Sequence, residues 1–115
     1  MFLVIFSGIY SQSSDTITIL SYNLLNFPDG RNDCSNNTVV PDRYDTLLKI
    51  IEYTQPDIFV ACEVQVKRGA DSVLTRSLNV NGITKYAMAN WVSNTSGFGD
   101  LNNILFYNTD ILVLH

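Results

Sequence analysis

The sequence has few basic residues, few cysteines and a single histidine. Its 7 lysines and arginines stand against 11 acidic residues, with a formal net charge of −4. Broad electrostatic capture of nucleic acid needs clustered basic residues, so the charge argues against it but leaves open an enzyme that binds phosphate through a metal ion. Cys34, in a polar loop, and Cys62, in an apolar run, have no spacing typical of a zinc site or redox pair. We expect no disulfide between them, because a central strand rarely offers its side chain to a distant loop.

A long apolar run at the N-terminus is also missing. Residues 2–6 are apolar, but such a run is too short to span a bilayer, so no stable membrane span is expected. Together with the polar spacer after it, the run is typical of the h-region and cleavage zone of a secretory signal, although the basic n-region is absent. We therefore predict that residues 1–15 are a signal-peptide remnant and spacer, with a plain first strand as the alternative.

What the sequence does have is enough apolar material for one domain over residues 16–115. It is 46% hydrophobic and 16% charged, which fits a compact fold with a core. Residues 64–69 and 93–100 read as loops, and 108–110 as the turn of a hairpin. The predicted strands are 16–22, 57–62, 84–92, 103–107 and 111–114, and the predicted helices are 43–54 and 70–79.

The order strand, helix, strand over residues 16–62 predicts a βαβ unit. Its helix has one apolar face, formed by Tyr44, Leu47, Leu48 and Ile51. The crossover should be right-handed and the two strands parallel. Parallel strands end at the same edge of a sheet, where ligands bind in open α/β folds. Asn23 and Glu63, which we expect to end the two strands, are therefore predicted to face one cleft.

Three stretches in this order resemble the endonuclease/exonuclease/phosphatase superfamily, the fold of DNase I-like nucleases and inositol polyphosphate phosphatases. Residues 19–27 read Ile-Leu-Ser-Tyr-Asn-Leu-Leu-Asn-Phe, residues 56–65 read Pro-Asp-Ile-Phe-Val-Ala-Cys-Glu-Val-Gln, and residues 102–108 read Asn-Asn-Ile-Leu-Phe-Tyr-Asn. The family usually has Gln where this chain has Cys62. The resemblance implies an α/β fold, the N-terminal half of a DNase I-like α/β sandwich, with a mixed sheet and two flanking helices.

The resemblance also implies a site. Glu63 would be the metal ligand, for Mg²⁺ or another divalent cation such as Mn²⁺ or Ca²⁺, and Asn23 would belong to the catalytic hydrogen-bond network. The chemistry suits both residues, since Mg²⁺ binds one or two carboxylates together with waters and phosphate oxygens. An amide adds hydrogen bonds without adding charge. Lys67 and Arg68 could contact a phosphate backbone just beyond Glu63, although cations on a loop are more often only solvated.

The family's second half carries an Asp-x-Asn motif and a Ser-Asp-His-like motif, and neither is expected in these 115 residues. Asp100-Leu101-Asn102 spells the first motif but follows a loop rather than a strand, so we interpret it as a chance match. His115 has no Ser-Asp before it and is not expected to be catalytic. The sequence is predicted to continue past His115, and the domain to be truncated at its C-terminus.

The function predicted from the resemblance is Mg²⁺-dependent phosphodiester hydrolysis, by a secreted or periplasmic bacterial endonuclease-like protein of which this chain is the N-terminal part, inactive alone. Nucleic acid would be the substrate of the full-length protein. One alternative is a phosphatase or phosphodiesterase acting on inositol phosphates or sphingolipids, because the fold alone does not separate these activities. Another is a non-catalytic remnant or interaction fragment. The sequence leaves the oligomeric state open.

Overall fold

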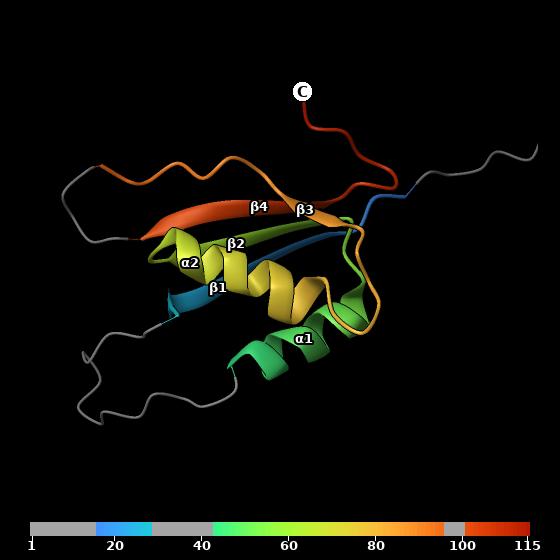
Figure 1. Ribbon diagram of the computed structural model, residues 1–115, viewed down its shortest axis with the longest axis horizontal. Coiled ribbons are helices and arrows are strands. Elements are labelled where there is room, and N and C mark those ends of the chain that lie inside the picture. Colours follow the sequence, from blue (N-terminus) through green and yellow to red (C-terminus); the bar gives the residue numbers. More distant parts are fainter. Residues whose placement is uncertain (1–15, 29–42, 96–100) are drawn as a thin grey trace, which may run out of the picture.

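The computed structural model describes residues 16–28, 43–95 and 101–115. Within them a four-stranded sheet carries its helices on one face (Figure 1). The last helical segment, η1, is π-helical and continues α2. The elements are β1 (Ile19–Phe27), α1 (Arg43–Thr54), β2 (Ile58–Val64), α2 (Lys67–Val73), η1 (Leu74–Leu78), β3 (Tyr86–Met88) and β4 (Asn102–Asn108).

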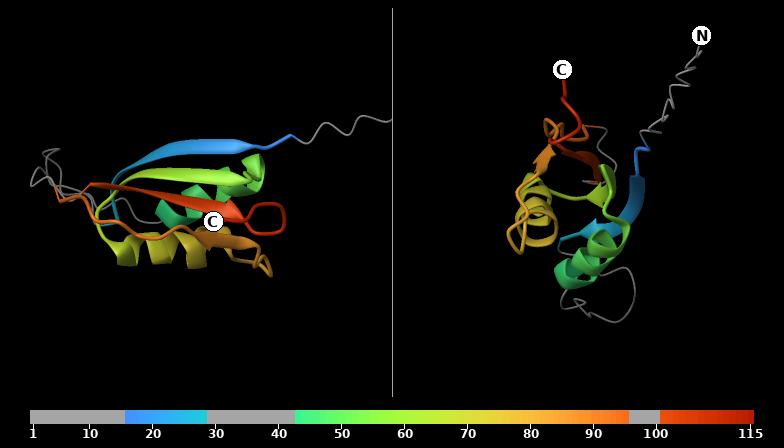
Figure 2. Two further views of the ribbon diagram at one scale, coloured as in Figure 1. Left: turned by 90° about the horizontal axis from the view of Figure 1, so that it is seen from above. Right: turned by 90° about the vertical axis from the view of Figure 1, so that its right-hand side faces the viewer.

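The sheet is mixed, with strand order β1-β2-β4-β3. β1 and β2 are parallel, as the βαβ pattern predicts, while β4 runs antiparallel to both β2 and β3. Figure 2 shows the sheet from two further sides, with α1 and α2 on the same face. The predicted α/β class, with a mixed sheet and two flanking helices, is confirmed.

The core lies between the sheet and the helices. Phe59 of β2 and Phe106 of β4 are register partners, both fully buried, and their rings stack with centroids 5.6 Å apart. Helix α1 has the bounds that its apolar period predicts and buries Leu47 and Ile51 against the sheet. Burial of this apolar surface is the main favourable term that holds the helices on the sheet. The other buried apolar residues are Leu24, Phe27, Ala61, Val64, Ala70, Val73, Leu78, Tyr86 and Ile104.

Several predicted boundaries are wrong. β1 does not end at Asn23 but continues to Phe27, and α2 begins at Lys67 inside a predicted loop. A helix can start there because Gly69 is small: a Cβ on it would meet Pro28 Cδ at 2.8 Å. β3 covers only Tyr86–Met88 of the predicted strand 84–92.

Residues 111–114 are not a strand, and no hairpin forms there. β4 already has β2 on one side and β3 on the other, so it has no free edge for a further strand. The predictions for residues 1–15, Cys34 and Asp100 fall outside the described residues. No helix in the described ranges is long and apolar enough to cross a membrane.

Candidate functional site

Asn23 and Glu63 meet where the regular parallel pairing of β1 and β2 stops, just after the pair of Asn23 with Cys62, although β1 itself continues to Phe27. The parallel pairing brings the two residues together, as predicted, but Asn23 does not end its strand. The side-chain amide Nδ2 of Asn23 donates to Glu63 Oε1 at 2.7 Å. The two residues are 40 positions apart in the chain, so tertiary structure alone brings them together. Asn23 is exposed and Glu63 half-buried, which leaves the pair accessible to solvent.

The two strands are irregular where the pair lies. Asn23 pairs with Cys62, and the next pair is Phe27 with Val64, so residues 24–26 of β1 lie opposite Glu63 alone. The register of the β2–β4 ladder also shifts between Ala61 and Val64, the interval that contains Glu63. Bulges of this kind bend the strand and re-aim a side chain, and they are common next to active sites.

Three residues of this bulge have left-handed backbone conformations. The φ angles are 48° at Leu25, 54° at Asn26 and 60° at Glu63. A residue other than glycine in this region costs about 1–3 kcal/mol and persists only where the surroundings impose it. Here Leu24 and Phe27, 5% and 1% exposed, anchor both ends of the bulge in the core, whereas Leu25 is 66% exposed.

The bulge supplies hydrogen bonds to both residues of the pair. The backbone N–H of Asn26 donates to Glu63 Oε2 at 3.3 Å, and that of Leu25 donates to Asn23 Oδ1 at 2.8 Å. The Asn23 amide is thereby fixed in one orientation, with its oxygen toward Leu25 and its nitrogen toward Glu63. Each carboxylate oxygen of Glu63 accepts one hydrogen bond here and retains further lone-pair capacity.

Arg43, in the first turn of α1, holds the bulge from outside the sheet. Its Nη2 donates to the backbone carbonyl of Leu25 at 3.0 Å, and its guanidinium lies 5.1 Å from the centre of the Phe27 ring. Burial lowers the pKa of Arg43 from its usual value, while the nearby Tyr44 and Tyr22 raise it. Arginine still keeps its charge at any ordinary pH. The bulge therefore has a permanently charged guanidinium on the backbone carbonyl of Leu25.

A divalent cation fits this donor set as a site with one protein carboxylate. Glu63 has an ordered carboxylate, and the Asn23 amide beside it orients the ligand as the outer partners of metal ligands commonly do. In the part of the chain that the structure describes, no three His, Cys, Asp or Glu side chains gather to hold a metal.

The other candidate residues do different things. Lys67 Nζ pairs with Asp71 Oδ1 at 2.8 Å, one turn along α2, and both side chains are about half exposed. Asn102 is buried, and its amide donates to the carbonyls of Val64 and Gln65, so it ties β4 to the end of β2.

The hydrogen bonds described above for the pair do not involve Arg68, His115 or Cys62, although Cys62 is the register partner of Asn23. Arg68 and His115 are exposed, and Cys62 is a free thiol in β2.

The sequence prediction missed Asn26 and Arg43. Asn26 gave a usable signal, because asparagine is one of the few residues that tolerate the left-handed region. Residues 24–27 also lack the β-branched residues that fill the first part of the strand. Arg43 gave no signal, since its contact to Leu25 is tertiary.

Comparisons of the chain with protein-family models, with curated proteins and with solved structures found no match. The features of this chain that bear on function are therefore the geometry of the Asn23–Glu63 pair and the sequence motifs around it.

Proposed function

We propose that this chain is the N-terminal half of a DNase I-like fold and that the protein is a Mg²⁺-dependent phosphodiester hydrolase of the endonuclease/exonuclease/phosphatase superfamily. The observation that carries the proposal is the 2.7 Å hydrogen bond from Asn23 to Glu63, made where the regular pairing of two parallel strands gives way to a left-handed bulge. Such strain is characteristic of functional sites, because a fold keeps it only where the surroundings over-determine it.

In this proposal Glu63 binds the cation and Asn23 orients Glu63. The hydrogen bond from the Asn23 side-chain amide fixes Oε1 of Glu63, and the hydrogen bond from the N–H of Asn26 fixes Oε2. The remaining lone pairs of the carboxylate therefore point in set directions. Asn23 does this without adding a second negative charge, which would repel the phosphate group of a substrate. When bound, Mg²⁺ polarises the phosphoryl oxygen and stabilises the charge that develops on it.

A nucleic acid is the substrate we favour, bound through the cation rather than through a basic surface. The formal charge of −4 leaves such binding open, because a bound cation would supply the local positive charge that the protein surface lacks. Glu63 and Asn23 do not by themselves deprotonate a water, which needs a positioned general base. We therefore expect no hydrolysis by the 115-residue chain alone, and expect the base from other sequence of the same protein.

The test is cleavage of plasmid DNA by the protein expressed from the full reading frame that encodes this chain, with Mg²⁺ and with EDTA. Glu63→Gln should abolish cleavage. Glu52→Gln is the matched control, because Glu52 is the sequence's other glutamate and lies exposed on α1.

Mg²⁺-dependent cleavage that Glu63→Gln leaves intact would contradict the proposal. Inositol phosphates and sphingomyelin, assayed in parallel, separate the nuclease from the other phosphoesterases. Hydrolysis of one of these compounds, without cleavage of DNA, would support the proposed metal site but would identify a substrate other than nucleic acid.

A further inference from the structure

We propose that Arg43 and Asn26 are positioning residues: Arg43 holds the peptide group between Leu25 and Asn26, and the N–H of that clamped group fixes the Glu63 carboxylate before any cation binds. The role of these residues in metal binding rests on the proposed function, whereas the hydrogen bonds that form the clamp do not depend on it. Neither residue was expected at the site from the sequence.

The clamp is built on the peptide group that joins Leu25 to Asn26. Its carbonyl oxygen, on Leu25, accepts a hydrogen bond from Arg43 Nη2 at 3.0 Å. Its N–H, on Asn26, donates to Glu63 Oε2 at 3.3 Å. The C=O and N–H of a planar trans peptide point in opposite directions. The group is thus held from both sides, by a cation and by a carboxylate.

The charge of Arg43 strengthens the contact to Glu63. Hydrogen bonds in a chain polarise one another, so a guanidinium on the carbonyl makes the N–H of the same peptide a better donor. Arg43 itself is held by the Phe27 ring at 5.1 Å. The positive charge of Arg43 therefore acts on the carboxylate through one peptide group, and Arg43 does not itself bind Glu63.

The left-handed conformation of Asn26 aims the N–H. With φ at 54°, the chain turns so that Leu25 is exposed and the N–H of Asn26 faces Glu63. Glycine adopts this conformation without cost and asparagine tolerates it, whereas a β-branched residue strongly disfavours it. The side chain of residue 26 therefore matters through the backbone, which makes glycine the rescuing substitution and valine the disrupting one.

The experiment is NMR on the full 115-residue chain without metal, followed by Mg²⁺ titration. Side-chain couplings report the rotamers of Glu63. We expect one dominant rotamer in the wild type and in Asn26→Gly, and averaged rotamers in Asn26→Val and Arg43→Met. Arg43→Met keeps the stem against Phe27 but removes the donor. The dissociation constant for Mg²⁺ should rise about tenfold in the two disrupting variants, the lower end of the effect of losing outer-shell partners.

Arg76→Met is the matched control, because Arg76 stacks on the neighbouring Tyr44 ring, 3.9 Å from its centre, and has no part in the clamp. It should leave the Glu63 rotamers as in the wild type and the dissociation constant for Mg²⁺ within about twofold of the wild-type value. Urea unfolding of each variant checks that the fold is retained under the NMR conditions.

Averaged Glu63 rotamers in the wild type, or equal rotamers in Arg43→Met and Arg76→Met, would overturn the clamp. If the wild type binds no Mg²⁺ but the rotamers respond as expected, the clamp stands and the proposed function fails.

Discussion

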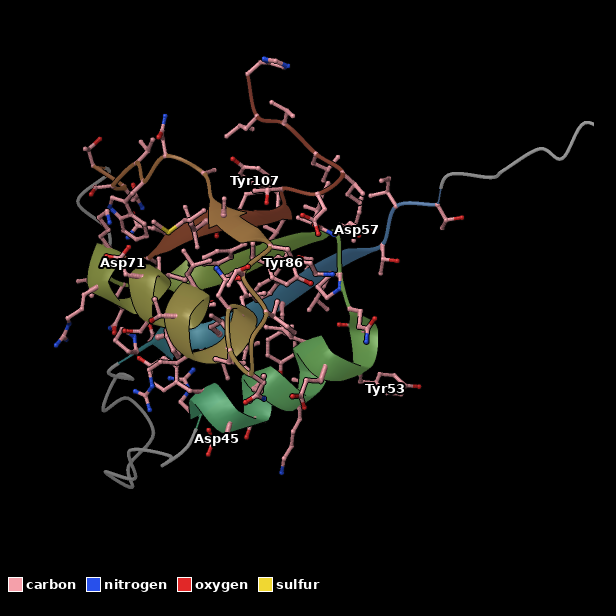
Figure 3. All side chains as sticks on the ribbon, turned by 45° about the vertical axis from the view of Figure 1, so that its right-hand side comes forward. Asp45, Tyr53, Asp57, Asp71, Tyr86 and Tyr107 are labelled. Atoms are coloured by element: carbon pink, nitrogen blue, oxygen red, sulfur yellow. The ribbon has the colours of Figure 1, made fainter. Side chains whose placement is uncertain are left out.

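The two ends of the sheet each carry an amide beside a carboxylate, yet they are built differently. At one end Asn23 donates to Glu63 at 2.7 Å, and at the other Asn108 Nδ2 approaches Asp57 Oδ1 at 3.4 Å. Asp57 lies with Tyr86 at the end of the sheet away from Asp71 of α2 (Figure 3). A carboxylate that meets an amide is therefore not, by itself, evidence of a binding site.

Asp57 makes hydrogen bonds that connect neighbouring strands. Its Oδ2 accepts the backbone N–H of Thr18 at 2.9 Å, its own N–H donates to the Thr18 carbonyl, and its carbonyl accepts the N–H of Asn108 at 2.8 Å. These bonds join the start of β2 to β1 and β4, and the pairs that follow are in regular register. The left-handed residue nearby, Gln55, directly follows α1, where helices commonly end this way.

Glu63 differs because one of its two donors, the backbone N–H of Asn26, comes from a bulge and not from a regular ladder. Three left-handed residues lie beside these donors, and among the described strands this is where the β1–β2 and β2–β4 ladders both shift register. Asp57 and Glu63 are both half-buried, so exposure does not separate them. What distinguishes Glu63 from Asp57, which joins strands, is the left-handed backbone at Glu63 and at the bulge opposite it.

The largest expected effect comes from removing the core anchor of the bulge. Phe27 is 1% exposed and meets Tyr44 edge to face at 5.0 Å. Phe27→Ala should lower the free energy of unfolding by about 4 kcal/mol, measured by urea unfolding. NMR shifts should change around Glu63 and stay unchanged around Asp57. A loss below about 1 kcal/mol would show that the bulge is not anchored as described.

Replacing the asparagine of each pair by aspartate should distinguish the Asn23–Glu63 pair from the Asn108–Asp57 pair by the loss of stability and by the response to Mg²⁺. Asn108 is 5% exposed, so Asn108→Asp should cost about 3 kcal/mol in urea unfolding, through an uncompensated buried charge beside Asp57. Asn23→Asp, at an exposed site, should cost about 1 kcal/mol. Millimolar Mg²⁺ should restore the stability of Asn23→Asp and not that of Asn108→Asp. Equal responses to Mg²⁺ would remove the distinction between the ends.

The smallest effect is a pH dependence at the Asp57 end. The Tyr86 hydroxyl donates to the Pro56 carbonyl at 2.8 Å, and burial, with a contribution from Asp57, raises the pKa of Tyr86 above its usual value. A raised pKa means that the fold favours the neutral form, so its contribution is complete below about pH 10 and is lost as the pH rises further.

Urea unfolding at about pH 8 to 11 should therefore show a steeper loss for the wild type than for Tyr86→Phe. Tyr53→Phe, on a ring that is 91% exposed, is the matched control and should follow the wild type. Parallel curves for the wild type and Tyr86→Phe would contradict the account.

The sequence predicts the parts of the fold that depend on local periodicity. The apolar spacing from Tyr44 to Ile51 gives helix α1 its observed bounds, and the order of elements gives the parallel pair. The proximity of Asn23 and Glu63 follows from that pairing and from no property of either residue.

The parts that depend on tertiary contacts could not be predicted. Gly69 reads as a helix breaker, and only its fit against Phe27 and Pro28 shows that α2 includes it. The apolar run 111–114 reads as a strand, but whether a strand forms depends on a free edge that β4 does not have. The bulge depends on Leu24 and Phe27 both reaching the core, which no alternation rule encodes.

The most direct test of the central claim is the location of Mn²⁺-induced line broadening in NMR spectra of the 115-residue chain, with Mn²⁺ standing in for Mg²⁺. The account predicts broadening of residues 23–27 and 62–64, unaffected by Asp57→Asn and removed by Glu63→Gln. Broadening centred on Asp57 and Asn108, or broadening at the bulge that persists in Glu63→Gln, would contradict it.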